Sequence, residues 1–90
     1  MSQAIADPQE LRRFAGQLKA FTMELSMQMG SLKTQLQALG QTWRDQENLK
    51  FQEEFDQTMV VLTRFVQAAE EQVPFLMRKA ERIEDYLHQR

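Results

Sequence analysis

Leucine recurs every seven residues in the first half of this chain, at positions 11, 18, 25, 32 and 39. A second apolar or small residue follows each of the first four leucines by four positions, at Ala15, Thr22, Met29 and Leu36. From Phe55 to Leu87 another apolar series advances in alternate steps of four and three residues. This spacing places one apolar stripe along an α-helix and does not fit the period of two of a β-strand. The sequence therefore predicts an all-α protein.

The punctuation residues divide the chain into two helices. Asp7 and Pro8 form a favourable helix start, and no proline follows before Leu39. Gly40 can adopt the left-handed conformation that often ends a helix. The next helix is predicted to start directly after it, with a capping box from Thr42 to Asp45. We expect a first helix over 8–39, a turn over 40–42 and a second helix over about 43–88. Residues 1–90 then form a single antiparallel hairpin domain.

Pro74 lies inside the second helical pattern, whose apolar phase continues across it without a break. Because proline removes a hydrogen bond and clashes with the preceding turn, we expect a kink near 70–74 in a longer second helix. With a turn at 40–42, residue 8 pairs with residue 74. Residues 75–90 should therefore project past the hairpin with their apolar side chains uncovered.

A further apolar or small stripe runs beside the main one on each helix. We take these stripes and the projecting segment as the expected interface with a partner: Gly16, Ala20, Met23, Met27, Gly30, Val61, Phe65, Ala68, Phe75, Leu76 and Ile83. A two-helix hairpin cannot cover two stripes per helix, whereas two hairpins packed as a four-helix bundle can. We therefore expect a dimer, either with a second copy or with a similar helical hairpin protein.

Composition excludes most classes of functional site. The chain has no cysteine and one histidine, so it cannot form thiolate or multi-histidine metal sites. Its 11 basic and 13 acidic residues leave a net charge of -2, which argues against nucleic-acid binding. No apolar run approaches the length of a membrane helix, and the N-terminal residues lack the pattern of a signal peptide. We expect no enzyme activity, no catalytic, cofactor or metal site and no membrane insertion.

Trp43 is the single tryptophan and lies at the predicted turn. Its ring can close the open end of the hairpin against the apolar seam. It can equally form a recognition knob on an otherwise polar tip. The two roles are compatible.

The stretch from Leu39 to Asp45, with Trp43 at the turn and Phe51 and Phe55 after it, resembles the WXG family of small early-secreted-antigen-like substrates of type VII secretion. The resemblance covers nearly the whole chain and includes its length and its helix–turn–helix plan. In the family motif a glycine stands two residues after the tryptophan, where this chain has Asp45. The resemblance implies Gly40, Trp43 and Asp45 as the turn and recognition residues.

The same resemblance implies a function in secretion. Family members form dimeric four-helix bundles that are exported folded, and some act as adaptors for larger effectors. Their export signal is a tyrosine followed four residues later by Asp or Glu; here Tyr86 occupies the tyrosine position and Arg90 the other. The implied protein is made in the cytoplasm and secreted without a cleaved signal peptide, with a larger effector or a secretion ATPase as further partners. The alternative is a cytoplasmic helical adaptor or chaperone that is not exported.

Overall fold

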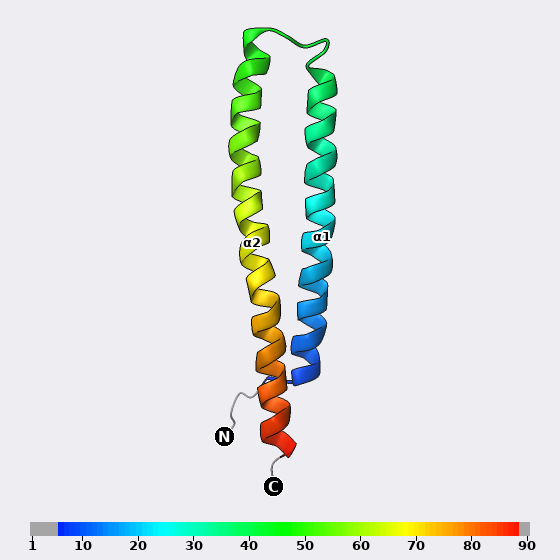
Figure 1. Ribbon diagram of the computed structural model, residues 1–90, viewed down its shortest axis with the longest axis vertical. Helices are drawn as coiled ribbons and strands as arrows, with labels where there is room; N and C mark the ends of the chain where they lie inside the picture. The colour runs from blue at the N-terminus through cyan, green and yellow to red at the C-terminus, as the bar shows by residue number, and fades with distance from the viewer. Residues whose placement is uncertain (1–5, 89–90) are drawn as a thin grey trace.

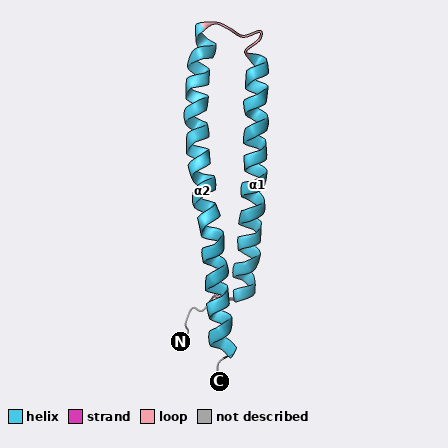
Figure 2. Cartoon of the chain, in the orientation of Figure 1, coloured by secondary structure: helices cyan, strands magenta, loops and turns pink. Residues whose placement is uncertain are grey.

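The computed structural model describes residues 6–88 as two antiparallel helices, which confirms the predicted all-α hairpin (Figure 1). Helix α1 spans Pro8–Leu39 and helix α2 spans Gln46–His88. The molecule is a thin rod of 70 × 20 × 17 Å. Figure 2 shows that everything between the start of α1 and the end of α2 is helical except the connection.

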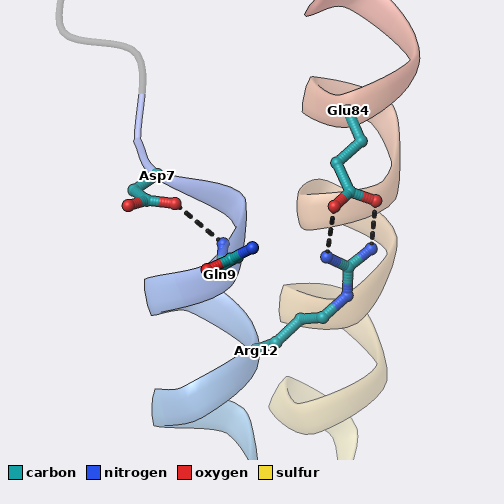
Figure 3. A network of polar contacts seen from close by, with 4 residues as sticks. All are labelled: Asp7, Gln9, Arg12 and Glu84. Atoms are coloured by element: carbon teal, nitrogen blue, oxygen red, sulfur yellow. Dashed lines mark hydrogen bonds and ion pairs between the residues drawn. The ribbon is translucent and has the colours of Figure 1, made fainter. Parts of the chain in front are cut away.

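Helix α1 begins at the residue that the sequence indicated. Asp7 is the N-cap, and its Oδ1 accepts a hydrogen bond of 2.9 Å from the backbone N–H of Gln9 (Figure 3). Pro8 occupies the first helical turn, where its missing N–H costs nothing. The helix therefore starts with one of its free amides satisfied and with an acidic residue at the positive end of its dipole.

The end of α1 differs from the expectation. Gly40 is right-handed, with φ -64° and ψ -12°, and no described residue has positive φ. The chain instead continues its right-handed winding beyond Leu39: the N–H of Thr42 and the N–H of Trp43 both donate to the Leu39 carbonyl, at 3.1 and 2.9 Å. Because these bonds satisfy the last carbonyls, no left-handed residue is needed.

The second helix starts at Gln46 and not at residue 43, so the connection covers residues 40–45. Asp45 is its cap, with Oδ1 accepting from the Asn48 N–H at 3.1 Å. The predicted cap at Thr42 is wrong, since the Thr42 hydroxyl donates to the Leu39 carbonyl at 3.3 Å. The buried Asn48 side chain donates through Nδ2 to the Trp43 carbonyl at 2.7 Å. This bond holds Trp43 in the connection, outside the helix.

The core is a single seam between the helices, built from the predicted heptad positions. Its buried residues are Ala15, Thr22 and Met29 of α1 and Met59, Val66, Ala69, Ala80 and Ile83 of α2. The Thr22 hydroxyl is satisfied by donating to the Lys19 carbonyl. No large side chain among the described residues is fully enclosed. Two helices alone therefore form a core that is one side chain thick.

The longer connection changes the register of the hairpin. Phe21 meets Phe65, with ring centroids 6.1 Å apart, and Arg12 reaches Glu84. The expected register placed those α1 residues opposite positions 61 and 70. The expectation that residues 75–90 project past the hairpin with their apolar side chains uncovered is therefore wrong in part. Ala80 and Ile83 are buried and Leu76 is half-buried. The exposed apolar residues of that segment, as far as residue 88, are Phe75, Met77, Tyr86 and Leu87.

Helix α2 continues without interruption through Pro74. Figure 1 shows its axis changing direction gradually over the yellow and orange part of the ribbon. The apolar pattern continues across Pro74 because a single helix runs through the proline.

An ion pair closes the open end of the hairpin. Both terminal guanidinium nitrogens of Arg12 donate to the two carboxylate oxygens of Glu84, at 2.7 and 2.6 Å (Figure 3). The hydrogen bonds from Arg12 lower the pKa of the Glu84 carboxyl, and those same bonds raise the pKa of Arg12. This paired geometry fixes the register at the end farthest from the turn.

The connection depends on Asn48, and this dependence can be measured. Asn48→Ala removes the bond to the Trp43 carbonyl, and we expect it to lower the free energy of unfolding by about 1–2 kcal/mol in urea denaturation. Gln57→Ala, at an exposed position of the same helix, is the matched control. An equal effect of both substitutions would contradict the role given to Asn48.

Candidate protein-binding surfaces

One long side of the hairpin carries aromatic side chains at positions that hold no charged residue. We call it the aromatic edge and define it by two heptad series, residues 14, 21, 28 and 35 of α1 and 51, 58, 65 and 72 of α2. The first series reads Phe, Phe, Gln, Gln and the second reads Phe, Thr, Phe, Gln. The edge-to-face contact of Phe21 with Phe65 places both series on the same side. Phe14 and Phe21 are 56% and 55% exposed although they lie beside the core.

The opposite side of the seam carries the charges. Arg12 and Glu84 lie there, and Lys19 and Lys33 of α1 and Asp56 and Glu70 of α2 occupy the same heptad positions. A solvated row of opposite charges is the ordinary edge of an antiparallel helix pair. The two edges therefore differ: the aromatic edge leaves four phenylalanine rings about half in water, whereas on the charged side a large apolar side chain, Met77, is exposed.

The expected stripe on α2 adjoins the aromatic edge. Val61, Ala68 and Phe75 each follow a position of the α2 series by three residues, which places them on the neighbouring strip of the helix surface. All three are exposed. Together with Phe65 they extend the aromatic edge around α2.

The expected stripe on α1 lies elsewhere. Gly16, Met23 and Gly30 each follow a position of the aromatic edge by two residues, which turns them by about 200° around the helix. Met23 and Met27 are 60% and 70% exposed, and Ala20 is exposed. A Cβ placed on Gly16 or Gly30 would meet nothing within 4 Å. The structure thus does not bring the two expected stripes onto one face.

Two of the expected interface residues belong to the hairpin's own seam. Ile83 is buried and Leu76 is half-buried within the chain. They lie opposite the first turns of α1 because of the shifted register. The remaining nine expected interface residues are exposed, and whether a partner covers them stays a prediction.

Aromatic rings stack along the turn end. Trp43 is half-buried, with its ring centroid 5.8 Å from Phe51, and Phe51 stacks on Phe55 at 6.1 Å. The ring of Trp43 therefore lies against the start of α2, as expected for a residue that closes the hairpin. The aromatic series ends in a hollow of about 340 Å³ between the helices, lined by Leu32, Gln35, Leu36, Leu39, Phe51 and Phe55.

The remaining predicted residues belong to the turn and to the end of α2. Asp45 caps α2 and is exposed, and Gly40 is half-buried in the connection. Tyr86 is 66% exposed near the end of α2, while Arg90 lies outside the described residues. The described residues contain no cluster of three acidic or histidine side chains that could hold a metal ion. Neither helix has the length and apolar content needed to cross a membrane within residues 6–88.

Sequence reasoning missed Phe14 and Phe21 as surface residues and Asn48 as a structural one. The two phenylalanines lie seven residues apart, each three after a seam position, and this spacing was a usable signal. Asn48 gave no such signal, because its role depends on where Trp43 lies.

Comparison with known proteins matches residues 3–86 to the family model WXG100, described as proteins of 100 residues with WXG. None of the curated protein sequences compared with the chain matches it. Among solved structures, the chain is similar to the secreted protein EsxB of Bacillus anthracis str. Sterne. A selenomethionine form has a TM-score of 0.79 at 26% identity, covering 96% of this chain and 98% of that one. A wild-type form has a TM-score of 0.78 at 26% identity, covering 93% and 97%.

The open surroundings of the glycines on α1 generate a prediction. Gly16→Ala and Gly30→Ala should each raise the free energy of unfolding by up to about 1 kcal/mol, because alanine favours the helix and nothing blocks its methyl group. Urea unfolding measures the gain, and sedimentation should show an unchanged oligomeric state. Loss of association in either variant would mean that a partner helix approaches closely at the glycine.

Proposed function

Because this chain belongs to the WXG100 family, we propose that it is a non-enzymatic protein of a type VII-like secretion system that acts by binding another helical hairpin through its aromatic edge. The observation that carries the binding role is the uncharged aromatic edge on a hairpin without one fully enclosed large side chain among its described residues. The family match supports the association with secretion.

Association through the aromatic edge would cover the phenylalanine rings that the isolated hairpin leaves exposed. Phe14, Phe21, Phe51 and Phe65 each keep about half of their surface in water. Covering that half contributes roughly 1 kcal/mol per ring. The neighbouring Val61 and Phe75 add to the same face. A second hairpin laid on this face would turn a core one side chain thick into the centre of a four-helix bundle.

We propose a second copy of the chain as the first partner, since the eight positions that define the edge carry no charge that would repel the same positions of a copy. A similar hairpin protein presents the same chemistry and is the alternative partner. A larger secreted effector or a secretion ATPase would then meet the outside of the assembled bundle. In that role Trp43 and Asp45 form the tip, and Tyr86 is the candidate export residue.

The proposed edge can be separated from the stripe on α1 by one pair of variants. Phe21→Ala should weaken self-association at least tenfold, because each dimer loses two rings from its interface. Met23→Ala removes a similarly exposed side chain from the other side of α1 and should leave association unchanged. Sedimentation over micromolar concentrations measures both. Weakening by Met23→Ala alone would move the interface to the α1 stripe.

Export is tested at Tyr86. In the native host, we expect Tyr86→Ala to be retained in the cells, because it lacks both the ring and the hydroxyl. Tyr86→Phe lacks only the hydroxyl, and we expect its recovered amount in the culture medium to differ from that of the wild type. Unchanged export of Tyr86→Ala would remove Tyr86 from the signal. Retention of the wild type in cells that export other substrates would favour the adaptor or chaperone that is not exported.

A further inference from the structure

Three positively charged side chains gather on α2 near its C-terminal end, and we call them the basic cluster. Arg78 and Lys79 precede Arg82 by four and three residues, so the three lie close together on adjoining turns, and all are exposed. Arg82 lies two residues before Glu84, which turns it by about 200° around the helix, away from α1. Within the described part of the chain the one ion pair is that of Arg12 with Glu84, so no member of the cluster is paired.

The acidic residues near the cluster neutralise it only in part. Glu84 accepts the hydrogen bonds from Arg12 and is held on the side of α1. Those hydrogen bonds raise the pKa of Arg12, and the negative charge of Glu81 raises it further, so Glu81 also acts on the cation of α1. Asp85, three residues after Arg82, is the remaining acidic residue at this end of α2. The cluster therefore keeps a net positive charge.

The stability of the helix does not account for the cluster. Arg78 and Arg82 are like charges one turn apart, and such pairs destabilise a helix slightly. Cations stabilise the negative end of the helix dipole only within the last turn, which here covers residues 85–88 and lies beyond the cluster. An anionic partner would remove the repulsion, so the arrangement favours a role in binding.

Aromatic side chains flank the basic cluster on the same side of α2. Phe75 precedes Lys79 by four residues, and Tyr86 follows Arg82 by four. Their exposed fractions are 54% and 66%. Figure 1 shows that α2 extends past the start of α1 at this end of the molecule. The exposed strip of rings and cations therefore reaches the tip of the rod.

We propose that the basic cluster binds the anionic surface of a phospholipid membrane, with lipid phosphates against the three cations and the rings of Phe75 and Tyr86 at the level of the headgroups. The outer side of a helix is convex and suits a broad surface. An acidic protein segment would satisfy the cations but has no apolar boundary to receive the two rings. The proposal is independent of the proposed function, because the cluster lies beyond the residues that define the aromatic edge.

Flotation with lipid vesicles tests the proposal on the full chain. At low salt the wild type should float with vesicles of equal parts phosphatidylglycerol and phosphatidylcholine, and not with phosphatidylcholine alone. The triple variant Arg78→Gln/Lys79→Gln/Arg82→Gln should lower the partition coefficient about a hundredfold, since each cation near an anionic surface contributes about a factor of five. Physiological salt should weaken the binding of the wild type more than that of the variant.

The matched control removes three exposed cations from α1 and changes the net charge of the chain equally: Arg13→Gln/Lys19→Gln/Lys33→Gln. It should bind within a few-fold of the wild type. Phe75→Ser keeps every cation and should weaken binding about fivefold, because it removes a half-exposed ring from the contact. Circular dichroism checks that each variant keeps its helices.

Three results would overturn the proposal. Equal weakening by the two triple variants would assign the binding to the charge of the whole chain. A wild type that does not float with the anionic vesicles would remove the membrane as the partner. Retention of that wild type on immobilised polyglutamate, lost in the variant of the basic cluster, would instead assign the cluster to an acidic protein segment.

Discussion

The core of this molecule is a seam only one side chain thick, and this determines which side chains remain exposed. Ala15, Ala69 and Ala80 are its most deeply buried apolar residues, and small residues such as these let the helices approach closely but bury little surface. Larger side chains such as Leu25, Phe55 and Leu62 can be covered only in part, because a helix pair has no third element to lie over them. The exposed aromatic edge follows directly from this shortage of cover.

The connection decides which residues share that seam. Its length is set by the bond from Asn48 to the Trp43 carbonyl and by the Asp45 cap, both of which delay the start of α2. A later start moves every residue of α2 relative to α1. As a result Ala80 and Ile83 enter the core, and the segment after Pro74 becomes part of the hairpin.

The period of the apolar residues was sufficient to predict the two helices, their antiparallel packing and the residues that face the seam. Residues such as Met29, Met59 and Val66 are buried as their spacing required. The register was not predictable in the same way, because Thr42 and Asp45 are both good caps and the choice between them depends on local bonds, such as that from the Asn48 side chain to the Trp43 carbonyl. The additional stripe on α1, with Gly16 and Met23, is exposed and turned away from the aromatic edge, and its role as an interface stays a prediction.

The hairpin topology also sets the order in which contacts form during folding. Contacts beside the connection, such as Trp43 with Phe51, close loops of a few residues, whereas the bonds from Arg12 to Glu84 join residues 72 positions apart. The entropy of loop closure favours the short loops first and lets each new layer shorten the loop that the next layer must close. Folding can thus advance from the turn towards the open end, and the helix segments joined by the Arg12–Glu84 ion pair, which forms last, are the first part of the rod to separate.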